Sequence, residues 1–320
     1  MASASVTTQD ILAVVGPTAS GKTDLALALA RKLNGEIVSA DMGQMYRCLD
    51  AGTAKPEGRW TDGVYRVQGI PYHLVDNLDP GEPSDAGSFA RAAQTLIEEI
   101  LRRRRRPIIA GGSGLYIRAL FEGLDDLPPG DRELRARLQQ RALREGNETL
   151  HAELSLRDPR AARRIPAGNT QRLIRALEVL QLTGKPISDF WSRKCGGRSH
   201  STKLPVRYLG PEWSAAALNE RILQRAEIMF PNMIREAAAL VPARYSGTEP
   251  GFRCLGYPEA LACARGELSA QEGLARMASA TRAYAKRQRT WFRNQTSVLW
   301  RSGGNDHDAL AETFLRELGL

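Results

Sequence analysis

Residues 16–23 read Gly16-Pro17-Thr18-Ala19-Ser20-Gly21-Lys22-Thr23 and carry the strongest fold signal in this chain. It satisfies the pattern G-x-x-x-x-G-K-[ST] in full. In this pattern glycines let the backbone curl so that successive N–H groups point at phosphate oxygens. The lysine adds a positive charge, and the final hydroxyl can ligate Mg²⁺. Residues 16–23 therefore predict a phosphate-binding loop.

The flanking residues supply the strand and the helix that such a loop needs. Ile11–Val15 is a short β-branched run, and Asp24–Leu33 carries helix formers with apolar residues on one side. Glu36–Ala40 and Pro107–Ala110 have the pattern of further strands, with a helical pattern at Ser88–Arg106 between them. Strands that alternate with helices predict an α/β fold, a P-loop NTPase-like parallel sheet flanked by helices.

The pattern changes in the middle of the chain. Leu127-Pro128-Pro129-Gly130 has the composition of a linker, and 131–182 shows only helical patterns with arginine-rich polar faces. Gly196–Lys203 is typical of an exposed return, and Val206–Gly210 is a candidate strand that rejoins the sheet. We expect core segments at 1–123 and 204–320 and an all-helical insertion domain at 124–203.

The charge balance favours a polyanionic partner such as nucleic acid. Forty-five Lys and Arg against 36 Asp and Glu leave a net charge of +9 and a pI near 9.6. The run Arg102–Arg106 we interpret as a solvated helix end that complements the helix dipole.

Composition also excludes several classes of protein. Four scattered cysteines without CxxC spacing predict neither a disulfide framework nor a thiolate zinc site, and the four histidines fit no metal-ligand spacing. No apolar stretch approaches the roughly 18 residues of a membrane span, and Met1–Asp10 lacks the features of a signal peptide. We expect a cytoplasmic protein without a membrane partner.

Asp41 is the first candidate for chemistry outside the loop. It follows the strand at 36–40, and the carboxyl ends of parallel strands form the ligand crevice, so its carboxylate should lie beside the phosphate site. There it could accept a proton from an attacking nucleophile. A helix N-cap or an outer contact to Mg²⁺ is an equal alternative from the residues alone.

The strand at 107–110 is followed by Gly111-Gly112-Ser113-Gly114 rather than by a carboxylate. Many P-loop ATPases need an Asp at such a strand end to orient Mg²⁺ and water. A motor-type ATPase is therefore disfavoured. The glycines suggest instead that something bulky approaches the backbone closely, with Ser113 as a polar contact.

The ordered motifs of the whole chain resemble those of the tRNA dimethylallyltransferases. The motifs are Gly16–Thr23, Ser39-Ala40-Asp41 with Gln44 and Tyr46, Gly52-Thr53-Ala54-Lys55-Pro56, Gly111–Tyr116, Gln171–Val179, Gly256-Tyr257, Thr281–Gln288 and Trp291-Phe292-Arg293.

The resemblance implies a change of substrate for the phosphate loop. Residues Gly16 to Thr23 would hold the diphosphate of dimethylallyl diphosphate in place of a nucleotide. Asp41 would hold the exocyclic N6 of the adenosine just 3′ of the anticodon and act as general base. Thr23 with Mg²⁺ as cofactor would stabilise the leaving diphosphate, and Arg221 is the position that matches the family's diphosphate-binding arginine.

The resemblance also implies contacts to the tRNA anticodon stem-loop, whose target base must be extruded from its stack. The matching residues are Asp41, Met42, Gly43, Gln44, Ser113, Arg135, Gln171, Arg172, Leu173, Ile174, Arg175, Arg253, Cys254, Leu255, Gly256, Tyr257, Pro258, Arg282 and Lys286.

The C-terminal basic segment has two faces at helical spacing. Arg282, Lys286, Arg289 and Arg293 form one, which suits phosphate contacts or simply a solvated surface. Tyr284, Gln288, Trp291 and Phe292 form the other, which we assign to the core.

Three positions depart from the family pattern. Met42-Gly43 stands where a serine usually follows the aspartate, which removes a hydroxyl near the target base. Asn169 and Asn232 replace a frequent Asp and a frequent Gly, and both changes are compatible with the fold because asparagine accepts N-cap and left-handed positions. A chain of this size that binds a polyanion can act as a monomer.

Three other functions compete. A small-molecule kinase explains the first 60 residues but not the arginine-rich insertion. Prenyl transfer to free AMP or ADP uses the same donor without needing a large insertion. A non-catalytic RNA-binding protein would not need the intact Gly21-Lys22-Thr23.

Overall fold

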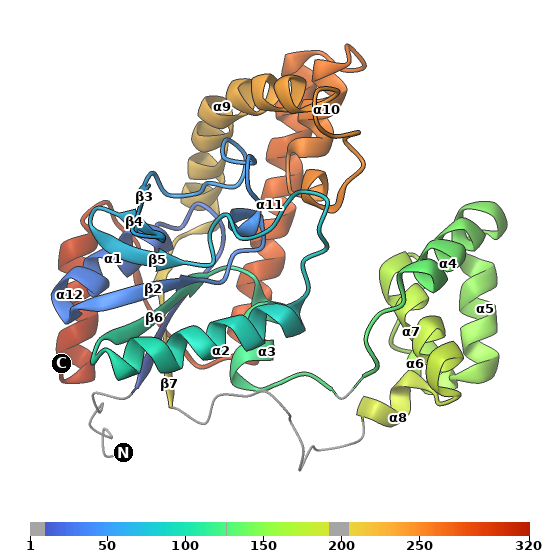
Figure 1. The fold of residues 1–320 in the computed structure, drawn as a ribbon, viewed down its shortest axis with the longest axis horizontal. Coiled ribbons are helices and arrows are strands. Elements are labelled where there is room, and N and C mark those ends of the chain that lie inside the picture. The colour runs from blue at the N-terminus through green and yellow to red at the C-terminus, as the bar shows by residue number, and fades with distance from the viewer. Residues whose placement is uncertain (1–9, 126, 192–204) are drawn as a thin grey trace. The chain divides into compact units, whose positions relative to one another are not determined.

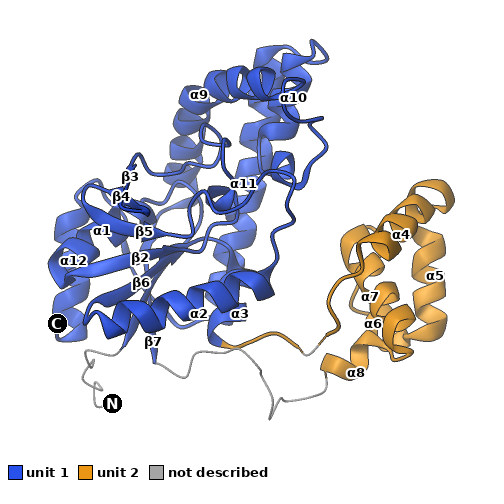
Figure 2. Cartoon of the chain, in the orientation of Figure 1, with its two compact units in different colours: residues 1–121, 202–320 blue, residues 122–201 orange. Residues whose placement is uncertain are grey.

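The computed structural model describes residues 10–125, 127–191 and 205–320, and the predicted return at 196–203 lies outside them, as do Cys195 and His200. The chain forms two compact units, shown in Figure 2. One combines Met1–Phe121 with Thr202–Leu320, and the other is Glu122–Ser201.

A mixed eight-stranded sheet organises the first unit, with the order β3-β4-β5-β2-β6-β1-β7-β8. The strands from β5 to β8 in this order are parallel, whereas β3, β4 and β5 form an antiparallel meander. The parallel P-loop core is confirmed, and the meander and β8 are additions to it. The strands are β1 Ile11–Val15, β2 Gly35–Ser39, β3 Arg59–Thr61, β4 Val64–Val67, β5 Ile70–His73, β6 Arg106–Gly111, β7 Val206–Glu212 and β8 Val298–Ser302.

Helices cover both faces of this sheet (Figure 1). Helices α1 (Lys22–Leu33) and α12 (His307–Leu318) pack on one face through a core that includes Leu25. Helices α2 (Ala86–Arg102) and α3 (Gly114–Phe121) pack on the other. The central strands β1, β2 and β6 are buried along their whole length, and β1 is accordingly apolar throughout, whereas β2 and β6 also bury Glu36 and Arg106.

A second core of the same unit joins the loops after β2 to three helices. These helices are α9 (Ala215–Leu240), α10 (Tyr257–Ala264) and α11 (Ala270–Gln295), with short 3₁₀ turns η1 (Gly43–Met45) and η2 (Pro250–Arg253). Their core includes Tyr46, Phe230 and Tyr257. A capping box formed by Ser269 and Glu272 starts α11.

The second unit is all-helical and has its own apolar core. Its helices are α4 Arg132–Glu145, α5 Asn147–Arg157, α6 Pro159–Ala162, α7 Thr170–Thr183 and α8 Ile187–Trp191. Asn169 caps α7 by accepting from the Arg172 amide at 3.3 Å, as its N-cap assignment predicted.

The arginine run after α2 is a solvated helix end at Arg102, Arg103 and Arg104, as predicted, but not at Arg106. The helix ends at Arg102 because Arg104 takes a left-handed conformation, with φ of 57°. Arg106 is already inside β6, buried, and donates from its NH1 to the Asp10 carbonyl at 2.8 Å. Arg103 binds the buried Glu36 with both Nε and NH2. The run therefore ends a helix, starts a strand and neutralises a buried acid.

None of the helices among the described residues combines the length and apolarity needed to cross a membrane.

Candidate active site

The phosphate loop connects β1 to α1 at the carboxyl edge of the sheet. Gly21 caps α1 in the left-handed region with φ of 87°, and Ala19 is left-handed at 64°. These turns place the loop amides at the positive end of the helix dipole. The buried Ser20 hydroxyl has no hydrogen-bond partner among the described residues. An unpaired buried donor at a helix N-terminus is suited to an anion.

Lys22 curls back over this loop, and its Nζ lies 3.4 Å from the Pro17 carbonyl oxygen. Burial lowers the pKa of Lys22 to about 8, against the opposing effect of Asp41, and the nearby Arg225 lowers it further. The ammonium is thus poorly solvated before any ligand binds. A bound anion would restore the interactions that burial has removed.

Two arginines of α9, one turn apart, approach the loop differently. Arg221 was expected to reach the diphosphate, but its Nε donates to the Ala19 carbonyl at 2.9 Å and its guanidinium stacks 4.3 Å from the Trp213 ring centroid. Arg225 instead donates to the Thr18 hydroxyl at 2.6 Å, and burial beside Arg221 lowers its pKa while Asp41 opposes the effect. Sequence reasoning missed Arg225, although the i, i+4 spacing of the two arginines on one helix was a usable signal.

Asp41 lies just past the carboxyl end of β2, with Ala40 between them, and its Oδ1 accepts from the Gly43 amide at 3.1 Å. The backbone here is held by β6 and its loop, because Ala40 donates to Ala110 and the Ser113 amide donates to the Ala40 carbonyl. Ser113 also accepts from the Met42 amide at 3.4 Å through its hydroxyl. The aspartate is near enough to the loop cations to raise the pKa of Lys22. The structure therefore brings the loop, Asp41 and Ser113 together.

Tyr72, which sequence reasoning missed, lies buried on β5 beside this site. Its hydroxyl donates to the Gln44 Oε1 at 3.5 Å, the same oxygen that accepts from the Ser39 hydroxyl at 2.8 Å. Burial, with the negative Asp41 nearby, raises its pKa, so the phenol stays neutral.

The donor set fits the expected Mg²⁺. The described residues contain no cluster of three or more His, Cys, Asp or Glu side chains that could enclose a metal. Mg²⁺ seldom needs one, because it keeps several waters and takes few protein oxygens together with substrate phosphates. The Thr23 hydroxyl at the phosphate loop is such an oxygen.

The glycines after β6 do admit close neighbours, and those neighbours belong to the protein. A side chain at Gly111 would collide with the Ala40 backbone, one at Gly112 with the Gln288 amide, and one at Gly114 with the Trp291 ring. Gln288 was assigned to the core and is buried, but its amide also bridges two loops. Its Oε1 accepts from the Thr18 amide at 2.8 Å, and its Nε2 donates to the Gly112 carbonyl at 2.9 Å.

The predicted RNA-contacting residues of the first unit fall into two groups. Four of them are buried, namely Gln44, Cys254, Gly256 and Tyr257. The Gln44 side chain accepts from the Ser39 hydroxyl and donates to the Ala54 carbonyl. Tyr257 donates to Glu236 and accepts from the Gly52 amide. These side chains shape the turn around Asp41 rather than offering a free surface. The exposed members are Met42, Arg253, Pro258 and Lys286; Gly43, Leu255 and Arg282 are partly exposed.

The predicted RNA-contacting residues of the second unit divide in the same way. Leu173 and Ile174 belong to its apolar core. Arg135 and Arg175 both bind the buried Glu178, and Arg175 also donates to the Pro128 carbonyl, so they tie the linker to α7. Gln171 and Arg172 at the start of α7 are exposed.

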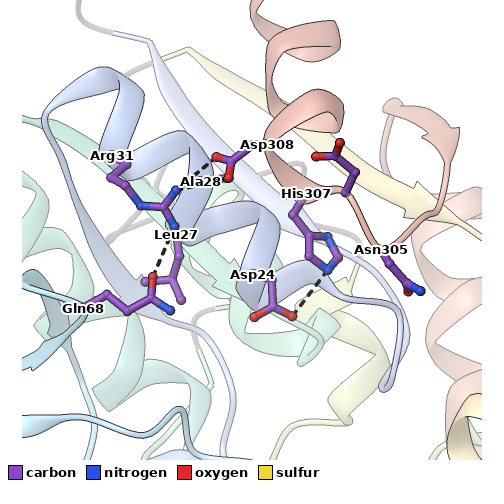
Figure 3. Close-up of a pocket in the computed structure, with 9 residues that line it drawn as sticks. Asp24, Leu27, Ala28, Arg31, Gln68, Asn305, His307 and Asp308 are labelled. Carbon is purple, nitrogen blue, oxygen red and sulfur yellow. Dashed lines mark hydrogen bonds and ion pairs between the residues drawn. The ribbon is translucent and has the colours of Figure 1, made fainter.

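A cavity of about 530 Å³ lies between α1 and α12, next to the end of the phosphate loop (Figure 3). Its charged residues are mostly paired: Arg31 binds Asp308 at 3.0 Å, and His307 lies 3.6 Å from Asp24. Three aspartates, Asp24, Asp306 and Asp308, line it. This acidic lining is unsuited to a diphosphate, so the phosphate loop is the better candidate for the active site.

Comparison with known proteins gives a consistent family. Residues 44–295 match the family model described as IPP transferase. The chain is 42% identical over 301 residues to the tRNA dimethylallyltransferase of Elusimicrobium minutum, covering 93% of this chain and 97% of the relative. It is 42% identical over 300 residues to that of Methylococcus capsulatus, covering 92% of each.

Solved structures agree. The tRNA isopentenylpyrophosphate transferase of Bacillus halodurans matches with a TM-score of 0.67 and 32% identity over 97% of both chains. A eukaryotic dimethylallyltransferase acting on tRNA has the same fold, with a TM-score of 0.74 and 21% identity over 96% of this chain and 77% of that one. The phosphate loop, the neighbouring aspartate and these likenesses together place the chain in the IPP transferase family.

Proposed function

We propose that the protein transfers a dimethylallyl group from dimethylallyl diphosphate to N6 of the adenosine just 3′ of the anticodon in tRNAs that read codons beginning with U. The observation that carries this proposal is one acid, Asp41, beside a phosphate loop with two poorly solvated cations, Lys22 and Arg225. The names of the relatives support the same donor and acceptor.

In the proposed reaction the N6 amine attacks the allylic carbon, forming a C–N bond while the C–O bond to diphosphate breaks. The bonding electron pair leaves with the diphosphate, and the N6 proton passes to the Asp41 carboxylate. The largest demand is stabilisation of charge on the leaving group, because an allylic carbon tolerates early bond breaking. Lys22, Arg225 and the loop amides meet this demand.

Thr23 would hold Mg²⁺, which when bound supplies further neutralisation of the diphosphate charge. Arg225 takes the role that the sequence assigned to Arg221. Arg221 supports the outside of the loop through the Ala19 carbonyl and Trp213.

On the acceptor side, the exposed Met42 and Arg253 are suited to contact the extruded adenosine and its neighbours. The side chains of Lys286 and Arg282 on α11, and those of Gln171 and Arg172 in the second unit, have no hydrogen-bond or ion-pair partner within the described residues and suit RNA phosphates. We infer that the enzyme acts as a monomer in the cytoplasm, where its tRNA substrate is available.

A label-transfer assay tests the proposal. The purified protein is incubated with labelled dimethylallyl diphosphate, Mg²⁺ and either tRNA, AMP or no acceptor. Label on tRNA alone is expected. Label on AMP would show that the acceptor is a free nucleotide rather than tRNA. ATP-dependent phosphorylation of a small alcohol in a parallel reaction would show that the protein is a kinase.

A further inference from the structure

Thr18, at the opening of the phosphate loop, is held from two sides by groups of opposite polarity. Its hydroxyl accepts from the cationic Arg225 at 2.6 Å, and its amide donates to the neutral Gln288 Oε1 at 2.8 Å. One N–H of the loop is therefore satisfied inside the protein. At this edge of the loop the Gln288 side-chain oxygen, which carries a partial negative charge, lies where the Thr18 N–H would otherwise be free to bind a phosphate.

The orientation of the Gln288 amide is fixed by its partners. Its Nε2 faces the Gly112 carbonyl at 2.9 Å, which requires a donor, so Oε1 must face the Thr18 amide. Gln288 is buried, and the absence of a side chain at Gly112 makes room for it. The carbonyl oxygen cannot turn away without leaving Gly112 or Thr18 unpaired.

We propose that Gln288 is a specificity-determining residue that makes this loop selective for a diphosphate over a triphosphate. The inference rests on the proposed function. Two phosphoryl groups bound at the start of α1 can use the amides of Ser20 to Thr23, with Lys22 and Arg225. A third phosphoryl group that extends toward Thr18 could not bind the Thr18 N–H, because Gln288 already accepts from it. This group would instead face the Gln288 side-chain oxygen, whose lone pairs repel a phosphate.

Wild-type protein tests the idea without a variant. With Mg²⁺ present, inorganic diphosphate is expected to bind about tenfold more tightly than tripolyphosphate, the effect of one lost hydrogen bond to a charged group. Charge alone predicts the opposite order, because tripolyphosphate is more negative and the loop is cationic. Tighter binding of tripolyphosphate would overturn the proposal.

The variant Gln288→Met removes the carbonyl at nearly constant volume and frees the Thr18 amide. The ratio of the two dissociation constants, measured by calorimetry, should fall to about one or reverse. Gln295→Met, an exposed glutamine on the same helix, is the matched control and should keep the wild-type ratio.

A purely structural role for Gln288 would weaken both ligands equally and leave the ratio unchanged, which would contradict the proposal. Gln288→Asn, whose shorter side chain cannot span both partners, provides a second variant that should shift the ratio in the same direction. If wild-type protein binds neither polyphosphate, the proposed function itself fails, whereas an unchanged ratio with intact diphosphate binding refutes only the selectivity.

Discussion

The charged side chains at the two ends of the parallel sheet differ in whether they are paired within the protein. At the amino end, Glu36 is buried and bound by His73 and Arg103, while Arg106 is engaged with Asp10. At the carboxyl end, Lys22 and Arg225 are poorly solvated, and both are near Asp41. The Ser20 hydroxyl at this end has no hydrogen-bond partner among the described residues. The paired charges at the amino end stabilise the fold, whereas the unpaired cations at the carboxyl end are available to bind a ligand. From the sequence alone, the charged residues at the two ends cannot be told apart, because both sets are polar residues next to strands.

The acid of the carboxyl end gives the largest expected effect. Asp41→Ala should lower transfer to tRNA by about 10³-fold or more, because general-base contributions reach about 10²–10⁴ and the N6 contact is lost as well. The affinity for tRNA should change little, since other contacts dominate it. Single-turnover rates and filter binding measure the two quantities. Near-normal turnover would remove Asp41 from the base role.

The two arginines of α9 should differ in the size of their effect. Arg225→Met should lower kcat/KM by about 10²–10³-fold through lost stabilisation of the leaving group. Arg221→Met, its matched control one turn away, should reduce activity by about tenfold or less and act mainly on thermal stability, because Arg221 holds the loop from outside. Equal losses of kcat/KM in both variants would argue against this division.

The lowered pKa of Lys22 predicts a pH dependence for diphosphate binding. With a pKa of about 8 in the free protein, Lys22 loses its proton above that pH, whereas bound diphosphate favours the charged form. Affinity should therefore fall by up to about tenfold per pH unit above pH 8, with proton uptake on binding. Calorimetry in buffers of different ionisation enthalpy measures that uptake. Binding without it near pH 8 to 9 would contradict the assignment.

The amino end of the sheet should respond in stability alone. Glu36→Gln should cost about 1–3 kcal/mol of unfolding free energy, because it leaves its partners incompletely paired, and activity at neutral pH should persist. Glu99→Gln, an exposed partner of the same Arg103, is the control and should cost less than about 0.5 kcal/mol.

Acid titration of unfolding separates these effects. Its cationic partners hold the pKa of Glu36 below its ordinary value of 4.5 despite burial. A lowered folded-state pKa means that the stabilisation is present above that ordinary value and is lost as the pH falls through the folded pKa. Wild-type protein should lose this increment in acid, and Glu36→Gln should show a flatter profile. Parallel profiles would exclude Glu36 as its source.

The sequence predicted those parts of the molecule in which local pattern and tertiary structure agree. The loop at 16–23, β1, α1, β2 and β6 follow from apolar runs and glycine spacing. The meander β3–β5 was missed because its first strand, Arg59–Thr61, is exposed and polar and gains order only from its partners. Strand β8 lies at the sheet edge and is only half-buried, so it lacks a strong apolar signal.

The site was harder to predict than the fold, because its missing members come from distant parts of the chain. Gln288 reaches Thr18 from 270 positions away, and Tyr72 reaches Gln44 from β5. Arg221 and Arg225 lie one turn apart on α9, and the path of the helix past the loop decides which of them contacts Ala19 and which contacts Thr18. Tertiary geometry decides such choices, not local pattern.

The most direct test is a crystal structure with an unreactive thio-diphosphate analogue of the donor and an anticodon stem-loop. The diphosphate should lie on the amides of the loop at 16–23, with the adenine N6 within hydrogen-bond distance of Asp41. A nucleotide triphosphate bound in the loop, or an adenine remote from Asp41, would contradict the central claim that the unpaired charges at this edge of the sheet serve prenyl transfer.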